Sequence, residues 1–156
     1  GPRCSDERSG LMVVACHSVD ETHILAEKLA AHISPGSVVA LIGDLGTGKT
    51  TFTQGFAKAL GISERVGSPT FKLVSEYDGV GYKLYHIDAY RLEGPDDFLN
   101  IGGEEYLVSD HGVTLIEWAD IIGELLPEDT VRVRFSRVQD HPESRRIEII
   151  GIEGDI

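Results

Sequence analysis

Residues 38–50 read VVALIGDLGTGKT, and this stretch decides the fold. The first five residues are all apolar, which is typical of a strand buried on both faces in a parallel sheet. A glycine-rich loop over residues 43–48 follows at once. Apolar residues then recur at the spacing of one helix face, at Phe52, Phe56 and Leu60. The stretch therefore predicts a buried strand, a tight loop, and a helix over residues 50–60 that ends at Gly61.

The loop matches the phosphate-binding pattern G-x-x-x-x-G-K-[ST] at every fixed position. Glycines let its backbone turn tightly and approach phosphates without a Cβ in the way, and the loop N–H groups and the helix start attract anions. An ordinary glycine-rich turn would not explain the flanking strand and helix. We expect Lys49 to reach the outer phosphates and the Thr50 hydroxyl to bind Mg²⁺. The residues expected to hold the nucleotide are Gly43, Leu45, Gly46, Thr47, Gly48, Lys49, Thr50 and Thr51.

The expected cofactors are ATP or ADP and Mg²⁺. A GTPase normally reads guanine with an Asn-Lys-x-Asp motif, and this chain has a single asparagine, Asn100, outside any such motif. GTP is therefore the less favoured nucleotide.

Strands and helices alternate along the rest of the chain. Ser18 and Glu21 form a capping-box pattern that starts a helix, and Pro95 starts a short one. Strands are expected over residues 12–16, 70–77, 82–90, 113–116, 131–138 and 145–152, and a further helix over residues 119–126. The predicted fold class is α/β: a P-loop NTPase-like three-layer sandwich with a mixed, mainly parallel central sheet and a terminal antiparallel strand pair.

The 156 residues have room for one domain. Residues 1–11 begin with Gly-Pro, as after protease cleavage, and are expected to be a disordered leader or a cleavage remnant. Residues 12–156 are expected to form a single P-loop ATPase domain. We see no membrane-length apolar run and no secretory signal, so we expect a cytoplasmic protein with no membrane partner. Cys4 and Cys16 are then not expected to form a disulfide.

The net charge of -12 argues against unaided binding of a nucleic acid. Such binding needs clustered lysine and arginine residues. A small arginine cluster near the C-terminus is interpreted as the solvated faces of two late strands. It consists of Arg132, Arg134, Arg137, Arg145 and Arg146. We therefore expect no DNA partner, and contact with RNA only through another protein.

A phosphate site of this kind also needs a carboxylate for Mg²⁺ and a group that orients the attacking molecule. Glu117 ends the apolar run of residues 113–116, where a Walker B acid stands, although aspartate is usual there. A solvated acid at a strand end is the alternative. Asp88 alternates with its neighbours on a predicted strand, so its face depends on the register. Its alternative is a structural ion pair with Arg91.

Two further residues have open alternatives. Thr70, in a Ser-Pro-Thr segment, is placed either to sense the γ-phosphate through Mg²⁺, as switch segments do, or simply to form a turn. Trp118 is the only tryptophan, and most single tryptophans pack in the core. Its position beside Glu117 makes it a useful reporter in either case.

Four motifs together resemble the bacterial TsaE family. They are GDLGTGKTTF from Gly43, SPTFKLVSEY from Ser68, HIDAYRL from His86, and Ile116-Glu117-Trp118. The resemblance extends over about residues 18–127, and the two terminal strands carry no distinctive motif. It implies a cytoplasmic ATPase of tRNA threonylcarbamoyladenosine biosynthesis, a modification of the adenosine beside the anticodon. It further implies two partners, TsaB and TsaD, with slow ATP hydrolysis in their absence and tRNA met only through them.

The resemblance also implies roles for single residues. Lys49, Thr50 and the loop amides would hold the phosphates, and Thr50 and Glu117 would bind Mg²⁺. Asp88 would position water or act as a base, and Thr70 would act as the switch.

Other interpretations stay open. Ser18 falls where the family touches the nucleotide, but a plain helix cap explains it equally well. For the whole chain, the alternatives are a nucleotide or small-metabolite kinase, or a non-catalytic module that binds ATP or ADP as a structural ligand. The kinase predicts a phosphorylated product. The module predicts that Asp88→Ala and Glu117→Ala leave partner function intact.

Overall fold

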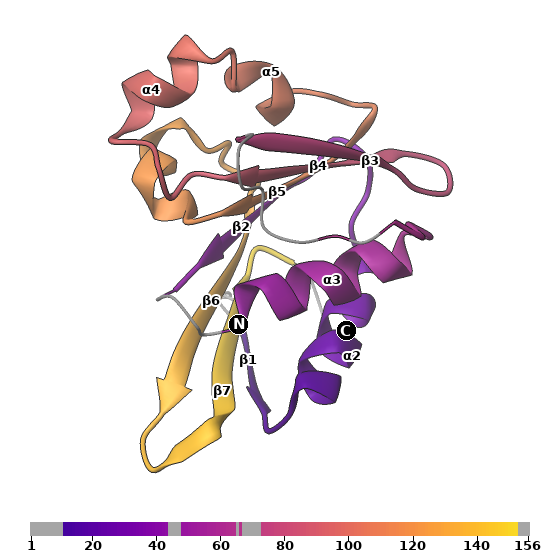
Figure 1. Ribbon diagram of the computed structural model, residues 1–156, viewed down its shortest axis with the longest axis vertical. Coiled ribbons are helices and arrows are strands. Elements are labelled where there is room, and N and C mark those ends of the chain that lie inside the picture. The colour runs from indigo at the N-terminus through magenta and orange to yellow at the C-terminus, as the bar shows by residue number, and fades with distance from the viewer. Residues whose placement is uncertain (1–10, 44–47, 65, 67–72, 153–156) are drawn as a thin grey trace, which may run out of the picture.

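The computed structural model describes residues 11–43, 48–64, 66 and 73–152 of the chain. Helices cover both faces of one central sheet (Figure 1). The strands are β1 (Leu11–Cys16), β2 (Val38–Ile42), β3 (Val74–Asp78), β4 (Lys83–Asp88), β5 (Gly112–Glu117), β6 (Val131–Val138) and β7 (His141–Ile150). The helices are α2 (Val19–Ala30), α3 (Lys49–Ala59), α4 (Pro95–Asn100), α5 (Glu104–Leu107) and the 3-10 helix η1 (Ala119–Leu125).

The seven described strands form one sheet in the order β1-β7-β6-β2-β5-β4-β3. The predicted α/β fold with a mixed sheet is thus confirmed. The expectation of a mainly parallel sheet is wrong, because three pairings are parallel (β6–β2, β2–β5 and β5–β4) and three are antiparallel (β1–β7, β7–β6 and β4–β3). The parallel strands occupy the middle of the sheet. The antiparallel pairs lie at its two edges, where β3–β4 and β6–β7 are hairpins that need no crossover helix and β1 pairs with the distant β7.

Each face of the sheet has its own hydrophobic core. Val39 and Leu41 of β2 pack into one core, and Val38 and Ala40 pack into the other, as the two-residue period of a strand requires. Helices α2 and α3 cover the first face, and α4, α5 and η1 cover the second (Figure 1). Because β2 is buried on both sides, its five residues include no polar side chain.

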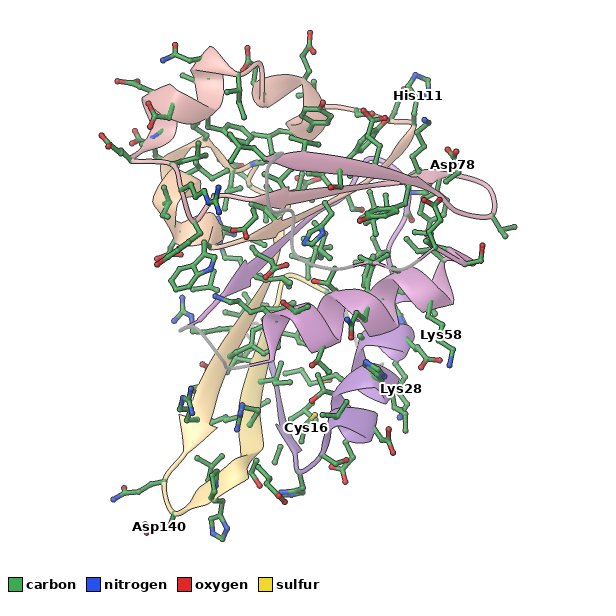
Figure 2. All side chains as sticks on the ribbon, in the orientation of Figure 1. Cys16, Lys28, Lys58, Asp78, His111 and Asp140 are labelled. Carbon is green, nitrogen blue, oxygen red and sulfur yellow. The ribbon has the colours of Figure 1, made fainter. Side chains whose placement is uncertain are left out.

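The two helices of the first face start and end at the expected signals. The Oγ of Ser18 accepts the N–H of Glu21 at 3.1 Å and caps α2. Helix α3 is followed by Gly61, whose φ of +81° is the left-handed conformation that commonly ends a helix. Lys28 and Lys58 lie in the last turns of α2 and α3 and suit the negative ends of the two helix dipoles (Figure 2).

Some predicted elements differ in type or extent. The segment predicted as a helix over residues 119–126 is the 3-10 helix η1, and it is kinked at Ile122, where φ is -114° and ψ is 24°. It lies between Trp118, which has a left-handed backbone conformation, and Pro127, and 3-10 geometry is common in such short connecting segments. The last strand begins at His141 rather than at residue 145, because its first residues pair with β6 alone. The strands predicted over residues 70–77 and 82–90 are described only as the shorter β3 and β4.

The arginine cluster lies on β6 and β7, as expected for solvated strand faces. Arg134, Arg137 and Arg146 are exposed, whereas Arg132 and Arg145 are partly buried. Among the described helices, none has both the length and the apolar character needed to cross a bilayer.

Candidate functional site

The candidate site forms where three neighbouring parallel strands end together. Strands β2, β5 and β4 end at Ile42, Glu117 and Asp88. Ligands of open α/β sheets bind at the carboxyl ends of the parallel strands. The glycine-rich loop leaves β2 at Gly43 and returns at Gly48, which caps α3 with φ 102° and ψ 14°. Other residues rarely adopt that conformation, so a glycine there lets the helix start directly after the loop.

Several predicted contacts lie outside the described residues. They are those of Leu45, Gly46 and Thr47 in the loop, and that of Thr70. Thr50 and Thr51 are described, and both lie partly buried in the first turn of α3.

Lys49 is the first residue of α3, and its side chain lies in the site although the residue is only 4% exposed. Its Nζ donates a hydrogen bond to the carbonyl of Gly43 at 2.5 Å. The same ammonium group lies 3.5 Å from the ring centroid of Trp118, which is a close cation–π contact. Trp118 in turn packs against the ring of Tyr90, with a centroid distance of 4.9 Å and an interplanar angle of 38°, and against the second core. The tryptophan therefore serves both as packing and as a wall of the site.

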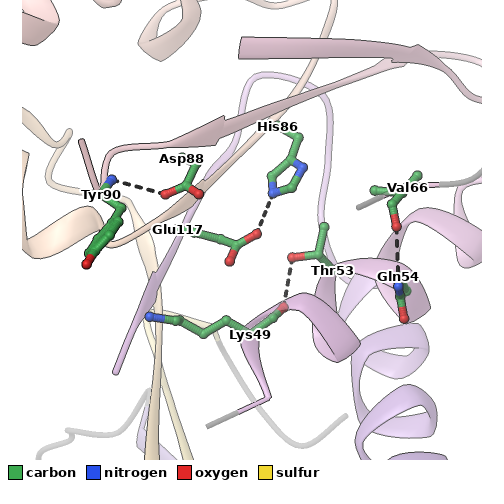
Figure 3. Close-up of polar contacts among 8 residues, drawn as sticks. All are labelled: Lys49, Thr53, Gln54, Val66, His86, Asp88, Tyr90 and Glu117. Carbon is green, nitrogen blue, oxygen red and sulfur yellow. Dashed lines mark hydrogen bonds and ion pairs between the residues drawn. The ribbon is translucent and has the colours of Figure 1, made fainter. Parts of the chain in front are cut away.

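The register of the sheet places the two predicted acids next to each other. Asp88 pairs with Glu117 across β4 and β5, and both side chains point to the face covered by α3 (Figure 3). Glu117 is 3% exposed, so the alternative of a solvated strand-end acid is wrong. Ion pairs among the described residues do not include one between Asp88 and Arg91. The carboxylates of Asp88 and Glu117 approach Lys49 from the ends of the strands (Figure 3).

Burial raises the pKa of the Asp88 carboxyl above its ordinary value. The N–H of Tyr90 donates to Asp88 Oδ1 at 3.0 Å and lowers this pKa, and the charge of Glu117 raises it again. His86 and Lys49 make smaller lowering contributions. A carboxyl group with a raised pKa is better matched to accepting a proton near neutral pH.

His86 belongs to the site, although no role was predicted for it from the sequence. It is fully buried on β4, and its Nε2 lies 2.6 Å from Oε2 of Glu117. A signal for it was present, because a residue two positions before Asp88 on a strand must point to the same face.

Two more polar contacts organise the helix beside the site. The buried Thr53 donates from Oγ1 to the carbonyl of Lys49 at 2.9 Å, and Gln54 donates to the carbonyl of Val66 at 3.3 Å (Figure 3). Ser18 acts as the cap of α2, which is the plainer of its two interpretations.

The described residues contain no group of three or more His, Cys, Asp and Glu side chains placed to hold a metal ion. The oxygen donors that the structure brings together at the site are instead the paired carboxylates of Asp88 and Glu117. Hard oxygen donors of this kind suit Mg²⁺, which is usually held by one or two carboxylates together with the phosphates of a substrate. The site can thus orient a phosphate-bearing ligand and neutralise its negative charge. Its carboxylates can also accept a proton.

Comparison with known families and proteins agrees with the motifs. The family model described as "Threonylcarbamoyl adenosine biosynthesis protein TsaE" matches residues 16–147. The "tRNA threonylcarbamoyladenosine biosynthesis protein TsaE" of Bacillus subtilis is 46% identical over 121 residues, which cover 78% of this chain and 75% of that protein. The protein of the same name from Treponema pallidum is 44% identical over 108 residues, which cover 69% of this chain and 78% of that one.

The fold is also similar to a solved structure. The crystal structure of Bacillus subtilis YdiB superposes with a TM-score of 0.75 at 39% sequence identity. The match covers 91% of this chain and 86% of that one.

Proposed function

The chain belongs to the TsaE family of threonylcarbamoyl adenosine biosynthesis proteins, and on this premise we propose that it is a partner-activated, Mg²⁺-dependent ATPase. It would bind and hydrolyse ATP in complex with TsaB-type and TsaD-type proteins during tRNA modification. One observation carries the proposal: Lys49, the fixed lysine of a complete phosphate-loop pattern, lies beside the paired strand ends that carry Asp88 and Glu117 (Figure 3).

The residues present fit a nucleotide with Mg²⁺. The phosphates would be held by the loop amides and Lys49, and the loop residues from Gly43 to Thr51 would line them. Thr50 and Glu117 offer the oxygen ligands for Mg²⁺, which when bound neutralises the charge of the phosphate oxygens. The ammonium of Lys49 contacts the carbonyl of Gly43 and the ring of Trp118, and on binding a phosphate it would exchange these contacts for the phosphate oxygens.

Asp88 is the group that would orient the attacking water and accept its proton. Its raised pKa and its position beside Glu117 support this role. Thr70 is proposed as the switch that responds to the terminal phosphate.

The proposed partners follow from the pathway of the family. The net charge of -12 supports contact with tRNA through the partners rather than directly. The cytoplasm, where tRNA is modified, is the proposed location.

Steady-state ATP hydrolysis tests the proposal, measured for the protein alone and with the TsaB–TsaD pair, with Lys49→Ala as the control. We expect slow turnover alone, a clear rise with the pair, and loss of both in the variant. Asp88→Ala and Glu117→Ala should each lower the stimulated rate at least about 100-fold while the protein still binds ATP. Tight ATP binding without turnover in the presence of the pair would instead favour a module that uses the nucleotide as a structural ligand.

A further inference from the structure

His86 is a fully buried polar side chain that none of the roles proposed above uses. It lies on β4 two residues before Asp88, and its side chain is 0% exposed. Its Nε2 lies 2.6 Å from Oε2 of Glu117, whose side chain is 4% exposed. Figure 3 shows the two side chains pointing toward each other from neighbouring strands, above the first turn of α3.

We propose that His86 is a positioning residue for Glu117. The Nε2–H of His86 donates a hydrogen bond that fixes Oε2 of the carboxylate and leaves Oε1 to the Mg²⁺ of the nucleotide. This inference rests on the proposed function, in which Glu117 serves Mg²⁺.

The second ring nitrogen of His86 supports this direction of the hydrogen bond. Nδ1 is buried and has no hydrogen-bond partner among the described residues. A neutral imidazole carries one N–H and one bare nitrogen, and the surrounding network decides which is which. A proton on Nδ1 would bury an unpaired N–H and would set two acceptors against each other at 2.6 Å. The Nε2–H tautomer leaves only a lone pair without a partner.

The hydrogen bond matters because a glutamate side chain is long and flexible. Without a fixed partner, the carboxylate of Glu117 would sample several rotamers, and ordering it would cost entropy each time a metal bound. Residues that orient a metal ligand typically change metal affinity or activity 10–100-fold when they are mutated. A merely space-filling histidine would instead tolerate any apolar side chain of similar size.

A matched pair of variants separates these two roles. His86→Gln keeps an N–H donor near the position of Nε2, whereas His86→Met has nearly the same shape and no donor. Leu84→Ala is the stability control, because Leu84 is fully buried on the same face of β4 and pairs with Val113, four residues before Glu117 on β5. ADP binding is measured by calorimetry with Mg²⁺ and with a chelator, and the ATPase activity is measured with the partner pair.

We expect His86→Met to weaken ADP binding about tenfold or more in Mg²⁺ and to leave it unchanged in the chelator. Its kcat should fall more than its KM changes. His86→Gln should restore both quantities to within about threefold of the wild type, and Leu84→Ala should lose stability but keep the Mg²⁺ effect. Equal Mg²⁺ dependence in the Met and Gln variants would overturn the inference.

Two measurements on the unchanged protein complete the test. A long-range ¹H–¹⁵N spectrum should report the Nε2–H tautomer for His86, and an Nδ1–H tautomer would contradict the proposal. If the wild type gains no affinity for ADP from Mg²⁺, the proposed function fails first and the inference falls with it. If the wild type shows that gain and His86→Met shows it equally, the inference alone fails.

Discussion

The ammonium of Lys49 lies against an aromatic ring. It contacts Trp118, which is the only tryptophan in the chain. All tryptophan fluorescence of the protein therefore comes from the ring that Lys49 contacts. A nearby cation perturbs the ring electrostatically. The fluorescence of Trp118 therefore reports whether the ammonium of Lys49 is in contact with the ring.

Binding of ADP with Mg²⁺ is expected to change the tryptophan emission, because the ammonium of Lys49 must move toward the phosphates. A fluorescence titration measures this change. The Lys49→Met variant lacks the ammonium. Without nucleotide it should show the same tryptophan emission as the wild type saturated with ADP and Mg²⁺. An emission equal to that of the free wild type would mean that the contact has no influence on the ring.

Asp88 is expected to oppose folding at neutral pH. Its pKa in the folded protein is raised, so the folded state binds the proton more tightly than the unfolded chain does, and stability falls as the pH rises from the ordinary aspartate value through the raised one. Asp88→Asn keeps an oxygen for the N–H of Tyr90 and removes the buried charge. It should raise the Tm at pH 7 by about 1–4 °C and abolish ATP hydrolysis.

Thermal melts between pH 4 and pH 8 measure this effect, and the gain should shrink as the pH approaches 4. Asp110→Asn is the control, because the side chain of Asp110 is 89% exposed. A loss of stability in Asp88→Asn at pH 7 would show that the carboxylate stabilises the fold.

Sequence patterns predicted the residues of the site unevenly. Lys49, Asp88 and Glu117 stand at fixed positions of motifs or strand ends, so local spacing was sufficient to find them. Whether Asp88 faced the site depended on the pairing of β4 with β5, which is a contact between distant parts of the chain. His86 escaped notice because a histidine inside an apolar strand is more often a packed residue than part of a site.

Among the elements, helices α2 and α3 lie in close contact at Gly55. A Cβ added at Gly55 would lie 2.9 Å from both the Cα and the carbonyl oxygen of His23. These are backbone atoms, so they cannot rotate out of the way. Helix α3, which carries Lys49, thus packs directly against the backbone of α2.

Gly55→Ala is expected to lower the free energy of unfolding by about 1–2 kcal/mol, because the clash outweighs the roughly 1 kcal/mol that alanine gains in a helix. Chemical denaturation measures the change. Gly123→Ala is the matched control, since no atom lies within 4 Å of its added Cβ, and it should change stability by less than about 0.5 kcal/mol. Equal stability in the two variants would show that the helices can separate without cost.

The type of each element could largely be predicted, and the exceptions have a common cause. Strands with clear alternation and helices with caps, such as α2 after Ser18, depend on neighbouring residues alone. Residues 119–126 satisfied the same local pattern, but between the left-handed Trp118 and Pro127 they form a 3-10 helix that is kinked at Ile122. The start of β7 depended on its pairing with β6, which the sequence does not display.

At the scale of the whole molecule, the strand order was the least predictable feature. The middle of the sheet is parallel, as the apolar β2 indicated, but β1 joins the edge through β7 rather than beside β2. No local signal distinguishes these arrangements. The balance of parallel and antiparallel pairings therefore differs from the prediction.

Charge is also unevenly distributed over the molecule. No lysine or arginine occurs between Arg91 and Arg132, so α4, α5 and η1 are acidic, whereas the late arginines lie on β6 and β7. Such a molecule as a whole repels a polyanion.

The protein alone is expected to bind tRNA no more tightly than about 100 µM at physiological salt, because non-specific binding depends on phosphate neutralisation by clustered cations. Filter binding with labelled tRNA measures this, with the TsaB–TsaD pair as the positive control. Micromolar, salt-sensitive binding by the protein alone that disappears in Arg134→Glu would assign the arginines of β6 to direct contact with tRNA.

Strand β1 has a single neighbour in the sheet, the late strand β7. During synthesis on a ribosome, residues 11–16 emerge long before residues 145–150 with which they pair. The emerging chain can assemble β2, α3 and β5 while the backbone N–H and C=O groups of β1 are still without their strand partner. This edge of the sheet can therefore close only after β7 has left the ribosome, and until then a chaperone can shield the unpaired strand.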